Sequence, residues 1–220
     1  MKREIIITED GSSTIHLPEW DEHYHSIHGA IQEAKHVFIK SGLSLFSDRE
    51  VSILEIGFGT GLNSFITFLE ASKLNLTIDY VGVEAYPITL EEIKKLNYVS
   101  ELEAIEFSEV FSKMHQQKWA VKNELSDTFS LTKRTQFFNE IKDKDIFNLI
   151  YFDAFGAQVQ PELWTEEIFK LMYAALKKEG VLVTYSAKGS VRRAMQLVGF
   201  TVERLAGPPG KREMLRATKR

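Results

Sequence analysis

The sequence predicts an α/β fold with a mostly parallel sheet, and three observations support this prediction. Apolar strand-like segments alternate with helical segments over most of the chain, and a glycine-rich turn directly follows the first buried strand of that series. The last two strand-like segments flank a Gly-Pro-Pro-Gly turn at residues 207–210, which predicts an antiparallel hairpin. Alternating strands and helices imply parallel strands joined by right-handed crossovers.

The segments before the glycine-rich turn predict a small N-terminal extension. Residues 4–7 and 14–17 are β-rich runs on either side of Asp10-Gly11, which indicates a hairpin. Residues 28–40 carry apolar side chains at helical spacing. We therefore expect residues 1–45 to form a hairpin and a helix that extend a single domain covering residues 1–220.

The alternation of strands and helices then continues to the end of the chain. We expect strands at 51–56, 78–83, 147–152 and 181–185, and helices at 63–72, 89–96, 161–177 and 191–198. Pro161 suits a first helical turn, and Gly199 suits the position after a helix. The stretch 98–145 is ambiguous, with a helix-like part near 108–118 and a strand near 127–132. Strands at 201–205 and 213–218 form the terminal hairpin. A seven-stranded sheet with this ending is typical of the Rossmann-like class I methyltransferase fold.

The composition excludes several classes of protein. The chain has 220 residues, of which 44% are hydrophobic and 26% are charged, and this mixture does not favour disorder. No apolar run approaches the roughly 18 residues of a membrane span, and no secretory signal is visible. The absence of cysteine excludes disulfides and thiolate metal sites and fits the cytoplasm. We predict no membrane association and no metal site.

The charge is distributed unevenly along the chain. The net charge of −4 does not suggest a nucleic-acid binder, but residues 177–220 contain 11 Lys and Arg against 3 Asp and Glu. Such a basic segment indicates either a phosphate-binding surface or a solvated face. Charge alone leaves both interpretations open.

The glycine-rich turn, E-I-G-F-G-T-G at residues 55–61, predicts a ligand at the carboxyl end of the first buried strand. Its spacing departs from the G-x-G-x-x-G of dinucleotide sites, and the carboxylate of Glu55 would repel a diphosphate. S-adenosylmethionine carries an ammonium and a sulfonium and no phosphate, so we favour it over NAD. Glu84 ends the next strand, where an acid binds ribose hydroxyls in either case. A glycine turn without a ligand is the remaining alternative.

Asp153 follows the buried strand at 147–152, at the sheet edge where ligands of α/β folds bind. A carboxylate there can hold an amine and accept its proton. Because an unperturbed aspartate has a pKa of about 4, orientation and charge stabilisation are the safer roles. The alternative is that Asp153 only caps a helix or lies in a loop, without a role in the chemistry.

Several of these segments together resemble the methyltransferase domain of the bacterial tRNA wobble-uridine modification enzymes of the MnmC family and its stand-alone relatives. The similar segments are G-F-G-T-G-L-N at 57–63, D-A-F at 153–155, L-W-T at 163–165, R-R at 192–193, G-F at 199–200 and K-R-E-M-L at 211–215. The spacing of the C-terminal motifs is specific, because a generic Rossmann protein has no reason to share it.

The resemblance implies methyl transfer from S-adenosylmethionine to the primary amine of 5-aminomethyl-2-thiouridine in tRNA. It places the acid for the amine on Asp153. The cofactor residues that it implies are Glu33, Glu55, Gly57, Gly59, Gly61, Asn63 and Glu84, with Glu140 as the nearest match to the family's adenine-reading acid. Bifunctional relatives also carry a flavin oxidase domain. We expect none in these 220 residues, so a separate enzyme would supply the amine.

The resemblance also favours the phosphate-binding interpretation of the basic segment. We expect Arg192, Arg193, Lys211 and Arg212 to form a phosphate-facing rim beside the pocket. Tyr24 and Phe155 are candidates for stacking on an extruded base, although large aromatic side chains are more often core residues.

Three other functions compete with this interpretation. An aminopropyl transferase of the spermidine-synthase type shares the fold and the acid, but its polyamine substrates are cations that the basic pairs would disfavour. A methyltransferase for a small amine fits the same motifs. A nucleotide-binding module without activity is the third, and Asp153 at the ligand edge argues against it.

Overall fold

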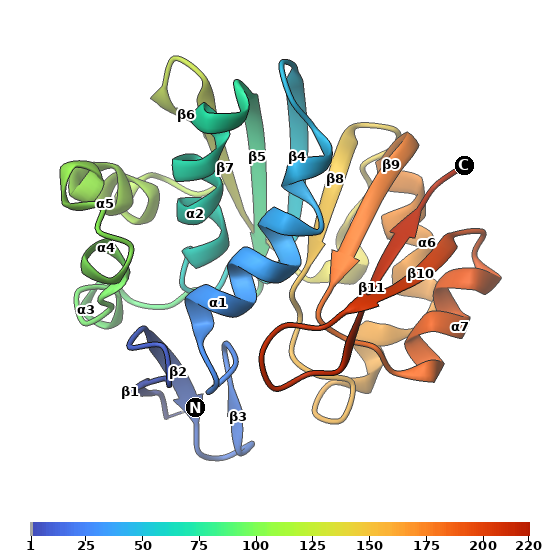
Figure 1. Ribbon diagram of the computed structural model, residues 1–220, viewed down its shortest axis with the longest axis horizontal. Helices are drawn as coiled ribbons and strands as arrows, with labels where there is room; N and C mark the ends of the chain where they lie inside the picture. The colour runs from blue at the N-terminus through green and yellow to red at the C-terminus, as the bar shows by residue number, and fades with distance from the viewer. Residues whose placement is uncertain (1) are drawn as a thin grey trace.

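The computed structural model describes residues 2–220 and contains two sheets (Figure 1). The smaller one is antiparallel and consists of β1 (Glu4–Ile7), β2 (Ser13–Leu17) and β3 (Glu22–His23). The larger one has eight strands in the order β10-β11-β9-β8-β4-β5-β7-β6. Its strands are β4 (Glu50–Ile56), β5 (Thr77–Glu84), β6 (Lys122–Ser126), β7 (Phe129–Thr135), β8 (Phe147–Phe152), β9 (Leu176–Thr184), β10 (Thr201–Ala206) and β11 (Glu213–Thr218).

The central strands of the larger sheet are parallel, which confirms the predicted fold class. β4 pairs in parallel with β5 and β8, β5 with β7, and β8 with β9, whereas β11 pairs antiparallel with both β9 and β10. The predicted count of seven strands is wrong by one. β6 adds an antiparallel edge strand outside β7, and its polar sequence, K-N-E-L-S, carries no strand signal.

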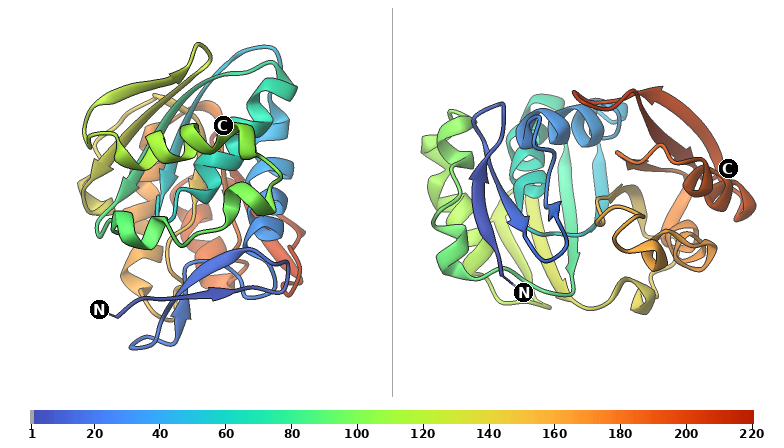
Figure 2. Two further views of the ribbon diagram at one scale, coloured as in Figure 1. Left: turned by 90° about the vertical axis from the view of Figure 1, so that its left-hand side faces the viewer. Right: turned by 90° about the horizontal axis from the view of Figure 1, so that it is seen from below.

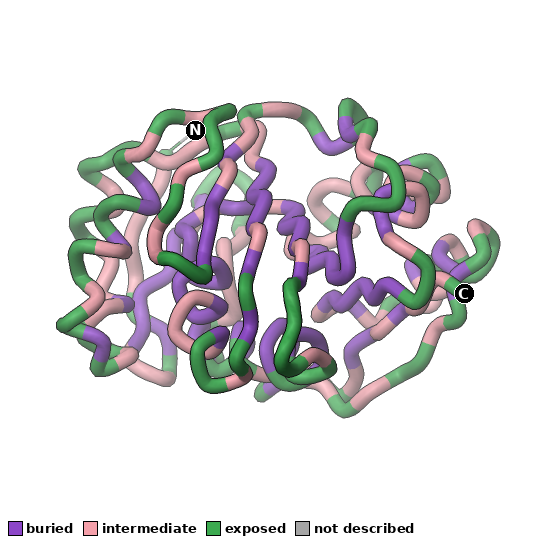
Figure 3. Tube along the Cα trace, turned by 90° about the horizontal axis from the view of Figure 1, so that it is seen from above, coloured by how far each residue is buried: buried purple, intermediate pink, exposed green. Residues whose placement is uncertain are grey.

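Helices cover both faces of the larger sheet. One face packs against α1 (Ala30–Ala34), its π-helical continuation η1 (Lys35–Lys40), α2 (Leu62–Ala71), α4 (Tyr98–Glu101) and α5 (Ser108–Gln116). The other face packs against α6 (Glu166–Ala175) and α7 (Gly189–Leu197). Short elements complete the chain: α3 (Leu90–Ile93), η2 (Leu43–Leu45), η3 (Ser72–Leu74), η4 (Ile105–Phe107), η5 (Phe138–Glu140) and η6 (Pro161–Trp164). Buried residues follow the central strands and the helix faces beside them (Figure 3).

The helix predicted over 161–177 is divided in the structure. η6 ends at Trp164, and Thr165 then caps α6 by accepting a hydrogen bond from the backbone N–H of Ile168. Trp164 is buried in the core and donates its indole N–H to the Phe155 carbonyl at 2.7 Å. The helix predicted over 89–96 is shorter as well, since only Leu90–Ile93 is α-helical after the Thr89 cap.

The small N-terminal sheet lies across the carboxyl ends of the parallel strands (Figure 2). Asn97 fixes it by accepting a hydrogen bond from Ser13 N at 2.7 Å and donating one to the Gly11 carbonyl at 2.9 Å. Arg3 adds a hydrogen bond to the Tyr86 carbonyl at 2.8 Å. These contacts hold the residues that follow β2 over the carboxyl ends of the parallel strands of the larger sheet. None of the helices within residues 2–220 is long and apolar enough to cross a membrane.

Candidate active site

A cavity of about 1040 Å³ lies between the two sheets, at the carboxyl ends of β4, β5 and β8. Among the residues predicted from the sequence, the cavity is lined by Tyr24, Glu33, Gly57, Gly59, Glu84, Asp153, Phe155 and Lys211. The others lie outside its lining: Glu55, Gly61, Asn63, Glu140, Arg192, Arg193 and Arg212. The three strand ends therefore meet at one site, as the sequence predicts for parallel strands.

The glycine-rich turn after β4 requires its glycines. Gly57, Gly59 and Gly61 have φ values of 90°, 48° and 72°, which L-residues with a Cβ rarely adopt. A Cβ on Gly57 would lie 2.6 Å from the carbonyl oxygen of Asp153. The turn is joined to β5, because Gly59 N donates to Glu84 Oε2 at 3.0 Å. Gly61 is the N-cap residue of α2.

Glu55 is fully buried beneath this turn and does not contact the cavity. Its Oε1 accepts a hydrogen bond from Asn63 Nδ2 at 2.9 Å, and the same Nδ2 donates to Asp153 Oδ2 at 2.8 Å. Burial raises the pKa of Glu55 well above its usual range, and the nearby Asp153 charge raises it further. The expectation that a Glu55 charge faces the cofactor is therefore not met, and Asn63 bridges two carboxyl groups instead.

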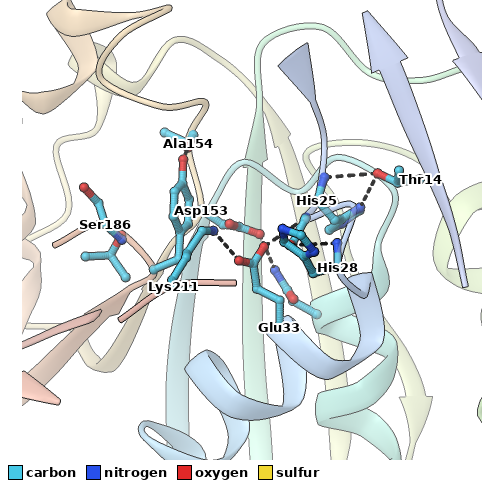
Figure 4. Close-up of polar contacts among 12 residues, drawn as sticks. Thr14, His25, His28, Glu33, Asp153, Ala154, Ser186 and Lys211 are labelled. Carbon is cyan, nitrogen blue, oxygen red and sulfur yellow. Dashed lines mark hydrogen bonds and ion pairs between the residues drawn. The ribbon is translucent and has the colours of Figure 1, made fainter. Parts of the chain in front are cut away.

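Asp153 belongs to a cluster of charged groups at the floor of the cavity (Figure 4). Burial and the charge of Glu33 raise the pKa of Asp153 to about 7, although the hydrogen bond from Asn63 and the charge of Lys211 oppose the rise. This value corrects the sequence argument from an unperturbed aspartate. A carboxylate with a pKa near neutrality is an effective proton acceptor at physiological pH.

Lys211 reaches into this cluster from the turn between β10 and β11 (Figure 4). Its Nζ donates to Glu33 Oε2 and lies 4.0 Å from the centroid of the Tyr185 ring. Lys211, expected in a phosphate-facing rim beside the pocket, thus lines the cavity itself and is paired with Glu33 there. Arg212, its neighbour in the chain, is exposed, as is Arg193 on α7, whereas Arg192 is partly buried.

Part of the cavity lining is aromatic. The ring centroids of Tyr24 and Phe155 are 5.1 Å apart and those of Trp20 and Phe155 are 5.9 Å apart, both in edge-to-face geometry. Burial raises the pKa of Tyr24 to about 12, so this side chain stays neutral. The structure thus keeps Tyr24 and Phe155 at the site, where a planar group can pack beside them.

Glu140, predicted to read adenine, turns away from the cavity and accepts a hydrogen bond from Phe137 N at 2.9 Å. Its neighbours Phe138 and Asn139 line the cavity instead. Sequence reasoning also missed His25, which lines the cavity and contacts Thr60 Oγ1 through Nε2 at 3.3 Å. Burial lowers the pKa of His25 to about 4, so its imidazole is neutral.

Comparison with known proteins identifies the family. Residues 106–220 match the family model described as S-adenosyl-L-methionine-dependent methyltransferase, and this match covers more than half of the chain. The chain belongs to this methyltransferase family. The reaction class and the cofactor predicted from the sequence are thereby confirmed.

Relatives of this methyltransferase carry a more specific name. The chain is 30% identical over 214 residues to the tRNA 5-methylaminomethyl-2-thiouridine biosynthesis bifunctional protein MnmC of Leptospira interrogans, and 28% identical over 215 residues to that of Idiomarina loihiensis. These alignments cover 90% and 89% of the chain but only 32% and 35% of the relatives. The chain thus spans about a third of the length of the curated relatives that it matches.

Solved structures support the fold of the methyltransferase. MnmC2 from Aquifex aeolicus superposes with a TM-score of 0.79 at 24% identity, over 100% of this chain and 70% of that one. Spermidine synthase from Thermotoga maritima superposes with a TM-score of 0.51 at 14% identity, over 95% of this chain and 69% of that one. The second similarity shows that the competing aminopropyl transferase shares the architecture.

The residues of the methyltransferase site fit S-adenosylmethionine. Acidic side chains outnumber basic ones in the lining, with Glu22, Glu33, Glu84, Asp153 and Glu162 against Arg3 and Lys211. Such a lining suits a cation and disfavours a diphosphate. Glu84 stands at the end of β5 and lines the cavity together with Gly57, Gly59 and Asp153. Within residues 2–220, no three His, Cys, Asp or Glu side chains are grouped so that they could hold a metal ion.

The buried Glu55 carboxyl makes the stability of the methyltransferase pH-dependent. Its folded-state pKa is raised above the ordinary value of 4.5, so its contribution to stability is complete below that pH and is lost as the pH rises. Glu55→Gln, which keeps the shape of the neutral acid, should therefore stabilise the protein more at pH 8 than at pH 5. One group contributes at most about 1.4 kcal/mol per pH unit. Urea unfolding of both proteins at the two pH values measures this difference, and an equal effect at both would contradict it.

Proposed function

We propose that this methyltransferase methylates the primary amine of 5-aminomethyl-(2-thio)uridine at the wobble position of tRNA. The observation that carries the proposal is Asp153, a carboxylate with a pKa of about 7 in a cavity that Tyr24 and Phe155 also line. The names of the relatives support it, since they denote biosynthesis of 5-methylaminomethyl-2-thiouridine in tRNA. A tRNA substrate would place the reaction in the cytoplasm.

The chemistry begins with the amine, which is protonated near neutral pH and has no lone pair in that form. Asp153 accepts one of its protons, and Asn63 holds the carboxylate while it does so. The bound cofactor supplies an electrophilic methyl group on its sulfonium. With the cofactor bound, the lone pair freed by Asp153 would be available to take this methyl group, and Asp153 and the surrounding cavity lining would hold the amine in place for the transfer.

The aromatic part of the cavity lining suits a nucleobase that has left its stack. A base extruded from tRNA can pack against Tyr24 and Phe155, and it would bring its 5-substituent toward Asp153. Methylation of this kind consumes a primary amine, so an earlier reaction must produce it. We assign that reaction to a separate enzyme.

Radiolabelled S-adenosylmethionine tests the function directly. The protein is incubated with bulk tRNA from cells that lack the modification, and the labelled nucleoside is identified after digestion. We expect label in a methylaminomethyl uridine, and no label when the tRNA comes from fully modified cells. Label confined to added small amines, with the cofactor still bound, would replace this proposal with a small-amine methyltransferase.

Arg193 and Arg212 are the exposed members of the predicted phosphate-binding set, and neither forms an ion pair within residues 2–220. The double variant Arg193→Ala/Arg212→Ala should weaken tRNA binding and reduce the slope of log affinity against log salt by about 2, because two phosphates would no longer be neutralised. Filter binding at several salt concentrations measures the slope. Arg216→Ala is the control, because Arg216 is already paired with Glu203. An unchanged slope would remove both arginines from the interface.

A further inference from the structure

Lys211 is held inside the cavity by contacts to separate parts of the fold. Its ammonium pairs with Glu33 on α1 and lies over the ring of Tyr185, the residue that follows β9. Tyr185 is itself fixed, because its hydroxyl donates to the carbonyl of Ala154, next to Asp153, at 2.8 Å. A cation over an aromatic face and against a carboxylate is in a defined position.

The Glu33 carboxylate has the Lys211 ammonium as its counter-ion. The Glu33 side chain is 8% exposed, and its Oε1 accepts a hydrogen bond from Ser26 N at 3.1 Å. A buried carboxylate that loses its counter-ion is costly and tends to take up a proton. Glu33 also acts on Asp153, whose pKa it raises. Two neighbouring carboxyl groups without a cation between them share a proton.

We propose that Lys211 is a positioning residue for methyl transfer: it holds Glu33 as its counter-ion and leaves Asp153 as the carboxylate that accepts the proton of the amine. The inference rests on the proposed function, in which an amine must lose a proton. It gives Lys211 a role at the reacting centre. The K-R-E-M-L motif at 211–215 instead suggests that Lys211 binds tRNA phosphate.

The other groups that face Asp153 do not take this role. Glu55, which shares Asn63 with Asp153, is fully buried, and its raised pKa favours the neutral acid. Burial raises the pKa of Tyr185 well above its usual value, so the phenol stays neutral. Burial is the largest cause of the raised Asp153 pKa, and Glu33 and Lys211 are the charged groups that act on it in addition.

Carbon-13 NMR of protein labelled at the aspartate carboxyl carbon tests this inference without any substrate. The Asp153 signal is assigned by its absence in Asp153→Asn. Lys211→Met should raise the midpoint of its titration by about 1 pH unit, and Lys211→Arg should leave it near the wild-type value. Lys219→Met is the matched control, because Lys219 also pairs with an aspartate, Asp145, and lies 5.0 Å from a tyrosine ring outside the cavity.

A double-variant comparison separates an action through Glu33 from a direct one. In the Glu33→Gln background, Lys211→Met should raise the Asp153 midpoint less than it does in the wild type, because only the direct effect of the ammonium charge on Asp153 remains. An unmoved midpoint in Lys211→Met, or equal shifts in both backgrounds, would overturn the inference. With tRNA, the acid limb of kcat/KM should move with the NMR midpoint. Absence of tRNA methylation would defeat the proposed function, while the titration would still decide the role of Lys211.

Discussion

Asp153→Asn should reduce kcat by about two to four orders of magnitude and leave the affinity for S-adenosylmethionine nearly unchanged. The amide keeps the size of the carboxyl group, so the cavity and the glycine-rich turn retain their shape. It cannot take up a proton, however, and it carries no charge to hold an ammonium. Single-turnover rates with tRNA and calorimetric titration with the cofactor measure the two effects separately.

The ionisation of Asp153 should also appear in the pH dependence of kcat/KM of the wild-type enzyme. Because the base acts in its ionised form, kcat/KM should fall about tenfold per pH unit below the pKa of Asp153, which is about 7, and level off above it. Asp145→Asn is the matched control, since Asp145 is exposed and pairs with Lys219 outside the cavity. Near-normal turnover of Asp153→Asn would refute the assigned role.

Gly57→Ala should weaken cofactor binding by about 100-fold or more. The residue has a φ of 90°, and the new Cβ would lie 2.6 Å from the backbone carbonyl of Asp153, which no side-chain rotation can relieve. Strain of this kind costs on the order of 1–3 kcal/mol before any displacement of the turn is counted. The displaced turn would also move Asp153, so turnover should fall as well.

Gly156→Ala is the control for this substitution. The nearest atoms to a Cβ on Gly156 are 3.8 Å away, which is ordinary contact, so cofactor affinity should stay near the wild-type value. Thermal unfolding of both variants shows whether each remains folded. Wild-type affinity in a folded Gly57→Ala protein would mean that the turn does not approach the cofactor.

The sequence predicts the parts of the fold that depend on apolar strands. β8 begins and ends where the buried run predicts, and the ends of β4, β5 and β8 bring Gly57, Glu84 and Asp153 together. β6 was not predictable from its composition, because a solvent-facing edge strand needs no apolar alternation. The pairing of β6 with β7 is visible only in the folded chain.

The side-chain directions at the site were harder to predict. Glu55 alternates with Leu54 and Ile56 along β4, so it faces the sheet side that carries α2, and a charge placed there must be buried. Lys211 lies in a turn, where the regular alternation of side chains that helices and strands have does not apply, so its direction could not be predicted. Tyr24 and His25 follow a two-residue strand, β3, and their approach to the cavity depends on the packing of the small sheet.

The bridge made by Asn63 gives Asp153 two inequivalent oxygen atoms. Oδ2 is occupied by the amide hydrogen of Asn63, whereas no hydrogen bond within residues 2–220 engages Oδ1. A proton arriving from the cavity therefore meets one preferred atom, and the carboxyl plane is fixed by the start of α2. The direction from which Asp153 can take up a proton is thus set by Asn63, in the helix that follows the glycine-rich turn, so one turn and one helix hold both the cavity wall and its carboxylate.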